Sequence, residues 1–393
     1  MRWNMTSAVL ALGLGCATGG TTRPAAESSA STDLMCLAYD DDPDTQFPED
    51  WYEELPDDDE PISREAASRF VNHAFDLVDN KFYDPTAFAA ERAQARHSAS
   101  KALTTADEPT RENTATIVKR AFQSIGVSHL HLLMPENARA LDDRVESSAE
   151  TRIQVAARMD GDVGILEVRS FLVPEISHES VQEALRTVRP AKSILIDLRG
   201  NGGGSISPVI YLAQYFVGPD RVLVSNRDRC NAKSDKPYLQ HGFFSDDVNA
   251  GSAADVSLHD ERGYVQWRTP LDAAPADPRP VFLLVDRHCG SACEVFTSAM
   301  QEHDAASILG ENTAGKVLAG LGYMSSWKGY LLIVPTATIL SPSGGSVEGE
   351  GVSPDVRITE CQQTSSDAEQ DADGNRCLQA ALEVVRDDAH HSL

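Results

Sequence analysis

The stretch from Arg279 to Lys316 constrains the fold most, because it joins a buried strand to a helix through a sharp turn. Residues 281–285, VFLLV, are short and apolar, which predicts a buried strand. After the turn HCG, apolar residues recur at helical spacing from Ala292 onward. Ser291 therefore stands where the strand turns into the helix. One interpretation is a capping serine, since Ser is favoured at helix N-caps. The other is an exposed hydroxyl beside helix N–H groups that can receive an oxyanion.

A second turn of this kind follows residues 193–198 in the sequence SILIDLRGNGGGS. A phosphate-binding loop would require Lys and then Ser or Thr after the glycines, and a dinucleotide fingerprint would require glycine at the place of Ser205. Neither is present. Glycines have no Cβ, so their N–H groups can approach a ligand closely. Two such turns at the same end of neighbouring strands would direct donors into one crevice.

Strand and helix patterns alternate along most of the chain. Strands are predicted at 163–168, 193–198, 221–225, 281–285, 307–310, 329–335 and 336–340, and helices at 180–188 and 208–216. This predicts an α/β fold with a mainly parallel sheet core and flanking helices. We expect a small helical N-terminal domain at 62–137, the α/β domain at 150–358 and a C-terminal tail with a short helix at 359–393. The polar excursion at 226–275 is expected to be a surface insertion.

The first residues have the pattern of an export signal. Arg2 precedes an apolar run at 8–15 that is too short to span a bilayer. Cys16 follows, which resembles the lipidated cysteine of a bacterial lipobox, although Gly13 stands where that motif favours leucine. A cleaved secretory signal at 1–16 is the alternative. We expect an exported protein of the bacterial cell envelope, held to the membrane by a lipid at Cys16.

Residues 17–61 are rich in Ser and Thr and then acidic, which is typical of a disordered tether. The net charge of −26 argues against nucleic acid as a partner. An exported chain permits disulfides. Cys361 and Cys377 are a plausible pair across a polar loop, whereas Cys289 and Cys293 are interpreted as small buried residues or half-cystines.

Four motifs occur in the order DLRGNGGG, GSACE, GENTAGK and VEGEGVSPD. Together they resemble the C-terminal-processing (tail-specific) proteases and the core of the tricorn protease, over residues 62–358. The resemblance implies a ClpP/crotonase-like catalytic domain with a serine nucleophile, a peptide or protein substrate, no cofactor and no metal. Many members carry a PDZ domain, but the interval between His129 and Val163 is too short for one.

Carried over by motif, the resemblance makes Ser291 the nucleophile. The N–H of Ser291 itself or of Ala292, with that of Gly203 or Gly204, would form the oxyanion hole. In tail-specific proteases the base is a lysine in the pattern G-x-x-T-x-G-K, which ends here at Lys316. A lysine base requires burial.

The tail-specific enzymes carry an orienting glutamine four residues after this lysine, where Gly320 stands. The tricorn-type alternative uses a Ser-His pair and a glutamate from elsewhere, which correspond to Ser128, His129 and Glu348. Histidine has a pKa nearer neutrality than lysine and needs less help from its environment. His129 is therefore favoured over Lys316 as the base.

Two further residues near these motifs, Glu350 and His131, remain alternatives. Glu350 is a second candidate for the acid, and His131 a second candidate for the base. His129 and His131 also have the spacing of a metal pair, but no further ligands accompany them.

The resulting expectation is a metal-independent serine endopeptidase of the cell envelope that acts by acyl transfer. The alternative is a non-catalytic lipoprotein that binds peptides or apolar ligands on the same scaffold, because a fold does not determine a function. Loss of the glutamine and of the PDZ domain is compatible with this alternative. Retention of the serine and of both candidate bases favours the enzyme.

Overall fold

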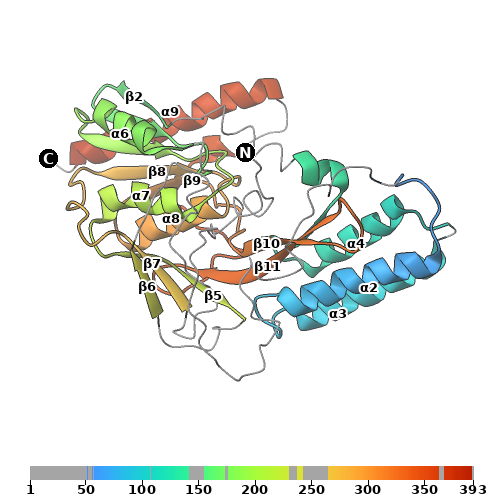
Figure 1. The fold of residues 1–393 in the computed structure, drawn as a ribbon. Coiled ribbons are helices and arrows are strands. Elements are labelled where there is room, and N and C mark those ends of the chain that lie inside the picture. Colours follow the sequence, from blue (N-terminus) through green and yellow to red (C-terminus); the bar gives the residue numbers. More distant parts are fainter. Residues whose placement is uncertain are drawn as a thin grey trace.

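The computed structural model describes residues 51, 55, 57–106, 108–140, 155–172, 176–229, 237–241, 264–362 and 367–391. The predicted signal at 1–16 with Cys16, and nearly all of the predicted tether, lie outside the described residues. Two six-stranded sheets organise the described part of the chain (Figure 1). Among the helices that are described, none combines the length and the apolarity that crossing a bilayer requires.

The first sheet is mainly parallel, as predicted. Its strands β3 (Val163–Glu167), β4 (Ser193–Asp197), β8 (Val281–Val285), β9 (Ser307–Gly310) and β12 (Val356–Arg357) run parallel to their neighbours. The edge strand β2 (Ala156–Asp160) pairs antiparallel with β3. Every residue of β4 and β8 is buried, because helices cover both faces of the sheet. This explains their continuous apolar runs.

Helices α6 (His178–Thr187), α7 (Ile206–Val217) and α8 (Ala292–Glu302) pack in one core on one face of this sheet. Helix α9 (Asp367–His391) covers the opposite face, where Leu382 and Val385 are buried. It is longer than the short helix expected for the tail. A disulfide joins Cys361, at the end of the short helix η5 (Thr359–Cys361), to Cys377 of α9, as predicted.

The second sheet is mainly antiparallel, and the sequence did not predict it. Its order is β1 (His131–Leu133), β11 (Leu331–Leu340), β5 (Val222–Asp228), β7 (Tyr264–Arg268) and β6 (Pro237–His241), with β10 (Ala319–Met324) also paired to β11. The two strands expected at 329–335 and 336–340 are one continuous strand through Pro335.

Of the predicted surface insertion at 226–275, residues 230–236 and 242–263 lie outside the described residues, and the described parts include strands of the second sheet. The insertion contributes β6 and β7 to this sheet, and Val265 and Trp267 of β7 are buried in the core that contains α7 and α8. Strand–helix alternation shows that strands exist. It does not show which of two sheets each strand joins, because that depends on pairing between distant segments.

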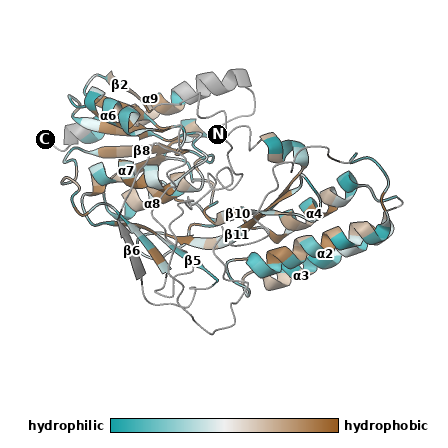
Figure 2. Ribbon diagram, in the orientation of Figure 1, coloured by the Kyte–Doolittle hydropathy of each residue, from teal (hydrophilic) through white to brown (hydrophobic). Residues whose placement is uncertain are grey.

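Helices α2 (Arg64–Lys81), α3 (Ala89–Thr105) and α4 (Arg111–Ile125) form the N-terminal segment, beside β10 and β11 (Figure 1). In Figure 2 strand β8 is hydrophobic, whereas α2 and α3 carry hydrophilic stretches. The buried side of the helices shares its core with Leu132, Tyr323 and Leu332 of the second sheet. The chain leaves α4 through Gly126, and Ser128 and His129 lie in the short connection between this helix and β1.

Candidate active site

The two predicted turns meet because β4 and β8 are adjacent parallel strands. Their carboxyl ends lie at the same edge of the sheet, as the sequence predicted. The N–H of Gly290 donates to the carbonyl of Asn201 at 3.1 Å. The buried carboxylate of Asp286 accepts the N–H groups of Gly200 at 3.1 Å and His288 at 2.9 Å. The glycine-rich turn and the Ser291 turn are therefore one hydrogen-bonded unit.

Ser291 occupies the N-cap position of α8, but its hydroxyl makes no capping hydrogen bond. Its backbone carbonyl accepts the N–H of Glu294 at 2.8 Å instead. Its φ of 54° and ψ of −121° are unusual for a residue other than glycine. Such strain persists only where surrounding contacts hold it, and it is common at functional sites. A strained serine between strand and helix has the geometry of a nucleophile elbow, not of a simple cap.

A disulfide joins Cys289 and Cys293 across this turn, so the half-cystine interpretation is confirmed. Both cysteines are fully buried. The N–H of Ser291 also donates to the carbonyl of Lys316 at 2.9 Å. The disulfide thus links the residues on either side of Ser291, and a backbone hydrogen bond holds Ser291 against the loop that follows β9.

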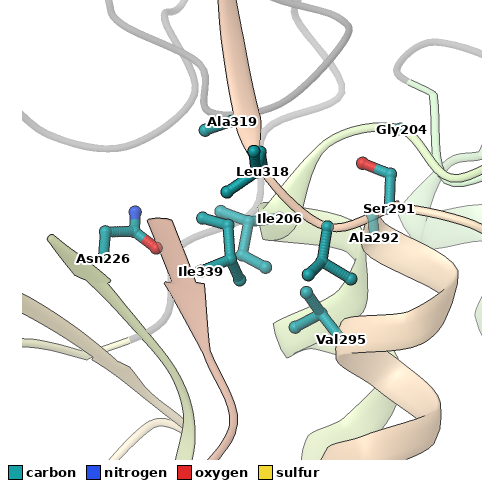
Figure 3. Close-up of a pocket in the computed structure, with 10 residues that line it drawn as sticks. Gly204, Ile206, Asn226, Ser291, Ala292, Val295, Leu318, Ala319 and Ile339 are labelled. Carbon is teal, nitrogen blue, oxygen red and sulfur yellow. The ribbon is translucent and has the colours of Figure 1, made fainter. Parts of the chain in front are cut away.

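The predicted oxyanion donors differ in whether their N–H group already has a hydrogen-bond acceptor. The N–H of Gly203 is already bound to the side-chain oxygen of Asn201 at 2.9 Å. In the described part of the chain, the N–H groups of Gly204 and Ala292 have no such partner, and both residues line a pocket with Ser291 (Figure 3). The geometry therefore favours Gly204 and Ala292 over Gly203 as donors.

Gly203 has a different role, which is to let the glycine-rich turn lie in close contact with the Ser291 turn. A Cβ at this position would lie 2.8 Å from the Cβ of Ser291 and 2.6 Å from the carbonyl oxygen of Gly290. Its φ of 104° also favours glycine. Any larger residue at 203 would push the two turns apart.

Ser128, His129 and Glu348 are brought together although 220 residues separate the serine from the glutamate. The hydroxyl of Ser128 lies 2.9 Å from Nδ1 of His129 and 2.9 Å from Oε2 of Glu348. The other carboxylate oxygen of Glu348 accepts the N–H of Ser128 at 2.9 Å. The three side chains form a continuous hydrogen-bonded chain.

This chain decides which nitrogen of His129 carries its proton. An ionised carboxylate only accepts, so the single hydroxyl hydrogen of Ser128 points to Glu348. The oxygen of Ser128 must then accept a hydrogen from Nδ1 of His129. Nε2 is left with a lone pair and, among the described residues, without a hydrogen-bond partner. That is the protonation state that a general base requires.

The segment after Lys316 connects this chain to Ser291. The carbonyl of Lys316 accepts the N–H of Ser291, and the next two N–H groups, of Val317 and Leu318, donate to Oε2 of Glu348 at 2.8 and 3.3 Å. The serine and the acid are therefore held by adjacent residues of one segment.

Gly320 gives a physical reason for the missing glutamine of the lysine-dependent enzymes. A Cβ at position 320 would lie 2.9 Å from the Cβ of His129. Glycine is therefore required where the histidine is present, because the two side chains would occupy the same space. Lys316 itself is exposed and lacks the burial on which a lysine base depends.

No hydrogen bond between the remaining alternatives and Ser128, His129 or Glu348 occurs among the described residues. Glu350 is exposed, and it is Glu348 that contacts Ser128. His131 lies on β1 with its side chain exposed. In the part of the chain that the structure describes, no group of three or more potential metal ligands occurs.

The family model of peptidase family S41 matches residues 162–358, half of the chain. The chain belongs to peptidase family S41. This confirms the resemblance to C-terminal-processing proteases at the level of the family. The S41 match includes the glycine-rich turn, Ser291, Lys316 and Glu348, and it begins after Ser128 and His129.

Two curated relatives are named as proteases. A probable CtpA-like serine protease of Staphylococcus haemolyticus is 26% identical over 178 residues, which are 44% of this chain and 29% of the relative. A carboxy-terminal-processing protease of Bartonella bacilliformis is 25% identical over 214 residues, which are 52% of this chain and 40% of the relative. The chain thus spans less than half the length of either relative.

Solved structures share the S41 fold. A putative peptidase from Parabacteroides merdae has a TM-score of 0.54 at 15% identity, and the alignment covers 81% of this chain and 96% of that chain. Mature CPAF in complex with lactacystin has a TM-score of 0.52 at 11% identity, with 75% and 94% covered. At such identities the likeness shows the fold alone, and it agrees with the expected α/β architecture.

Within this S41 site, the sequence did not single out two buried residues. Glu294 accepts hydrogen bonds from the turn and from the loop after β9, and Asn201 holds Val168 and Gly203. Both occur inside the motifs, as the last letter of GSACE and in DLRGN. A polar residue inside a glycine-rich motif is the signal that could have identified them, because a buried polar group needs partners.

Proposed function

We propose that the chain is a serine endopeptidase with Ser291 as nucleophile and His129 as general base. The observation that supports it most is the hydrogen-bonded chain from Glu348 through Ser128 to His129. This chain leaves Nε2 able to accept a proton, and the backbone of Lys316 and Val317 connects Glu348 to the strained Ser291. Membership of peptidase family S41 supports the same reaction class.

In the first step, Nε2 of His129 takes the hydroxyl proton while the oxygen of Ser291 bonds to the carbonyl carbon of a peptide. The carbonyl electrons move to its oxygen, which the N–H groups of Ala292 and Gly204 stabilise. The C–N bond then breaks, and the imidazolium gives its proton to the leaving amine. Through Ser128, the carboxylate of Glu348 stabilises the positive charge on the imidazolium.

In the second step, His129 accepts a proton from water, and the resulting oxygen nucleophile attacks the acyl-enzyme ester. The same two N–H groups stabilise the second oxyanion. Collapse of this intermediate breaks the bond to Ser291, whose oxygen regains the proton from the imidazolium. The products are a carboxylate peptide and free enzyme.

Ser291→Ala should abolish peptide hydrolysis and covalent labelling by a fluorophosphonate, because the attacking oxygen is gone. The measurement is gel fluorescence after labelling, together with cleavage of a peptide mixture followed by mass spectrometry. Ser98→Ala, on the exposed surface of α3, is the matched control and should keep both activities. Labelling that survives Ser291→Ala would contradict the nucleophile assignment.

A protein that is neither labelled nor able to cleave peptides, but that binds them, would instead be a binding protein on the same scaffold. Peptide binding by the purified chain, measured by calorimetry, separates this outcome from an inactive preparation.

We also propose that the protein is exported to the cell envelope and anchored by a lipid on Cys16. The support is the short apolar run before this cysteine and the acidic segment after it. Cys16→Ala should move the protein from the membrane fraction to the soluble fraction and abolish incorporation of a palmitate analogue. Incorporation that persists in Cys16→Ala would refute the anchor.

A further inference from the structure

Among the described residues, the pocket that Ser291 lines has, apart from this serine, one polar side chain, that of Asn226. Ile206, Val295 and Ile339 are among the side chains that line this pocket, which is partly open to solvent. Figure 3 shows Asn226 on one side and Ser291 on the other, with Ile206 and Ile339 between them. None of the described residues that line the pocket carries a charge.

Asn226 is an unpaired polar group in this apolar wall. Its side chain is 1% exposed, and neither its amide nitrogen nor its amide oxygen has a hydrogen-bond partner among the described residues. Strand pairing holds its backbone opposite Ile339 on one side and Val265 on the other. A buried carboxamide without partners is costly, and native structures rarely leave one unpaired without a reason. A ligand that brings matching groups would remove this cost.

The position of the pocket identifies which part of a substrate enters it. It is bounded by Ser291 and by the two residues with free oxyanion donors, Ala292 and Gly204. These groups would surround the carbonyl of the bond to be cleaved. The P1 residue, on the acyl side of that bond, has its Cα attached directly to this carbonyl carbon. Its side chain is therefore the part of the substrate that lies nearest the pocket.

We infer that Asn226 selects glutamine at P1, an inference that rests on the proposed function. Asparagine offers N–H donors and a carbonyl acceptor. A second carboxamide offers the same groups in reverse, so two reciprocal hydrogen bonds can form. Glutamine also has two methylene groups to lie against Ile206, Val295 and Ile339, one more than asparagine.

Other P1 side chains fit the pocket less well. Leucine or methionine would leave the amide of Asn226 buried and unpaired. Glutamate or lysine would bring a charge into a pocket whose described lining offers no opposite charge. Glutamine satisfies the amide without introducing a charge.

The test measures kcat/KM for peptides that differ only at P1, with glutamine, glutamate, methionine or leucine. Glutamine should be preferred over each of the others by about tenfold or more, because a site built for hydrogen bonds rejects analogues that lack them. In Asn226→Leu the preference should reverse towards methionine and leucine. Asn226→Ala, which removes the amide without adding apolar bulk, should also lose the glutamine preference.

Asn72→Leu, on the exposed side of α2, is the matched control and should keep the preference of the unaltered protein. Circular dichroism establishes that each variant is folded. Failure to cleave any peptide, together with no fluorophosphonate labelling, would refute the proposed function and this inference with it. Cleavage with methionine or leucine preferred by the unaltered protein, or a glutamine preference that survives in Asn226→Leu, would overturn the inference alone.

Discussion

Replacing His129 by alanine should lower kcat/KM for peptide hydrolysis at neutral pH by about a thousandfold or more. A positioned general base contributes about 10²- to 10⁴-fold, and here it also returns the proton to the leaving amine. Ser128→Ala should cause a smaller loss, because His129 remains but is no longer linked to Glu348. Steady-state kinetics on a common peptide measure both losses.

Lys316→Ala is the matched control, since the lysine motif makes Lys316 the other candidate base. Its backbone contacts to Ser291 and Glu294 do not require a side chain, so alanine preserves them. We expect kcat/KM to change by less than about tenfold, because the side chain is exposed. Full activity in His129→Ala together with loss in Lys316→Ala would reverse the assignment of the base.

The pH profile provides a second measurement of the same base. Burial, together with the positive charges of His131 and Lys316, lowers the pKa of His129 to about 4. The base is active when neutral, so activity is retained above this pKa and is lost as the pH falls through it. The acid limb of kcat/KM should therefore lie near pH 4 instead of the ordinary 6.5 of histidine. An acid limb near 6.5, in protein shown to be folded, would contradict the burial of the ring.

Glu294→Gln should destabilise the protein and slow catalysis, although the two side chains have the same shape. Glu294 is 0% exposed. One oxygen of its carboxylate accepts from Thr313 at 2.5 Å and Gly315 at 2.7 Å, and the other from Lys316 at 2.7 Å and Ser291 at 3.2 Å. Burial raises the pKa of the Glu294 carboxyl, and these hydrogen bonds oppose that rise.

An amide has only one acceptor oxygen, so two of the four donors would face an NH₂ group. In either orientation of the amide one N–H, of Gly315 or of Lys316, loses its acceptor, because the N–H of Ser291 keeps the carbonyl of Lys316 and the hydroxyl of Thr313 can rotate. A buried donor without a partner costs about 1–3 kcal/mol, which is the loss expected in the free energy of unfolding. Because Glu294 contacts the N–H of Ser291, kcat should fall more than KM rises. Thermal unfolding and steady-state kinetics measure the two effects.

Glu302→Gln is the control on the same helix, at its exposed end. It should change the free energy of unfolding by about 0.5 kcal/mol or less, since surface substitutions are usually small. Glu294→Gln with unaltered stability and unaltered kcat would show that the carboxylate does not hold the turn.

Much of the site can be read from local pattern. The apolar runs of β4 and β8 predict buried neighbouring strands, and the glycine-rich turn and the Ser291 turn then fall at one edge of the sheet. The sequence left two interpretations of Cys289 and Cys293, because it does not show whether two buried thiols lie within bonding distance. The inward-facing carboxylate of Glu294 was not predicted, since a glutamate in the first turn of a helix ordinarily faces solvent.

The strand–turn–helix around Ser291 is predictable from local sequence, because periodicity and backbone sterics act over a few residues. Contacts between distant segments brought three of the candidate residues into one hydrogen-bonded chain. Pairing of β1 with β11 carries Ser128 and His129 to a glutamate 220 residues away, and Gly320 leaves room for the ring. The tertiary structure also excluded a capping role for Ser291, since φ and ψ at the turn depend on contacts with other turns. The Ser128–His129–Glu348 chain and the conformation of Ser291 both depend on contacts between distant segments, which no local pattern encodes.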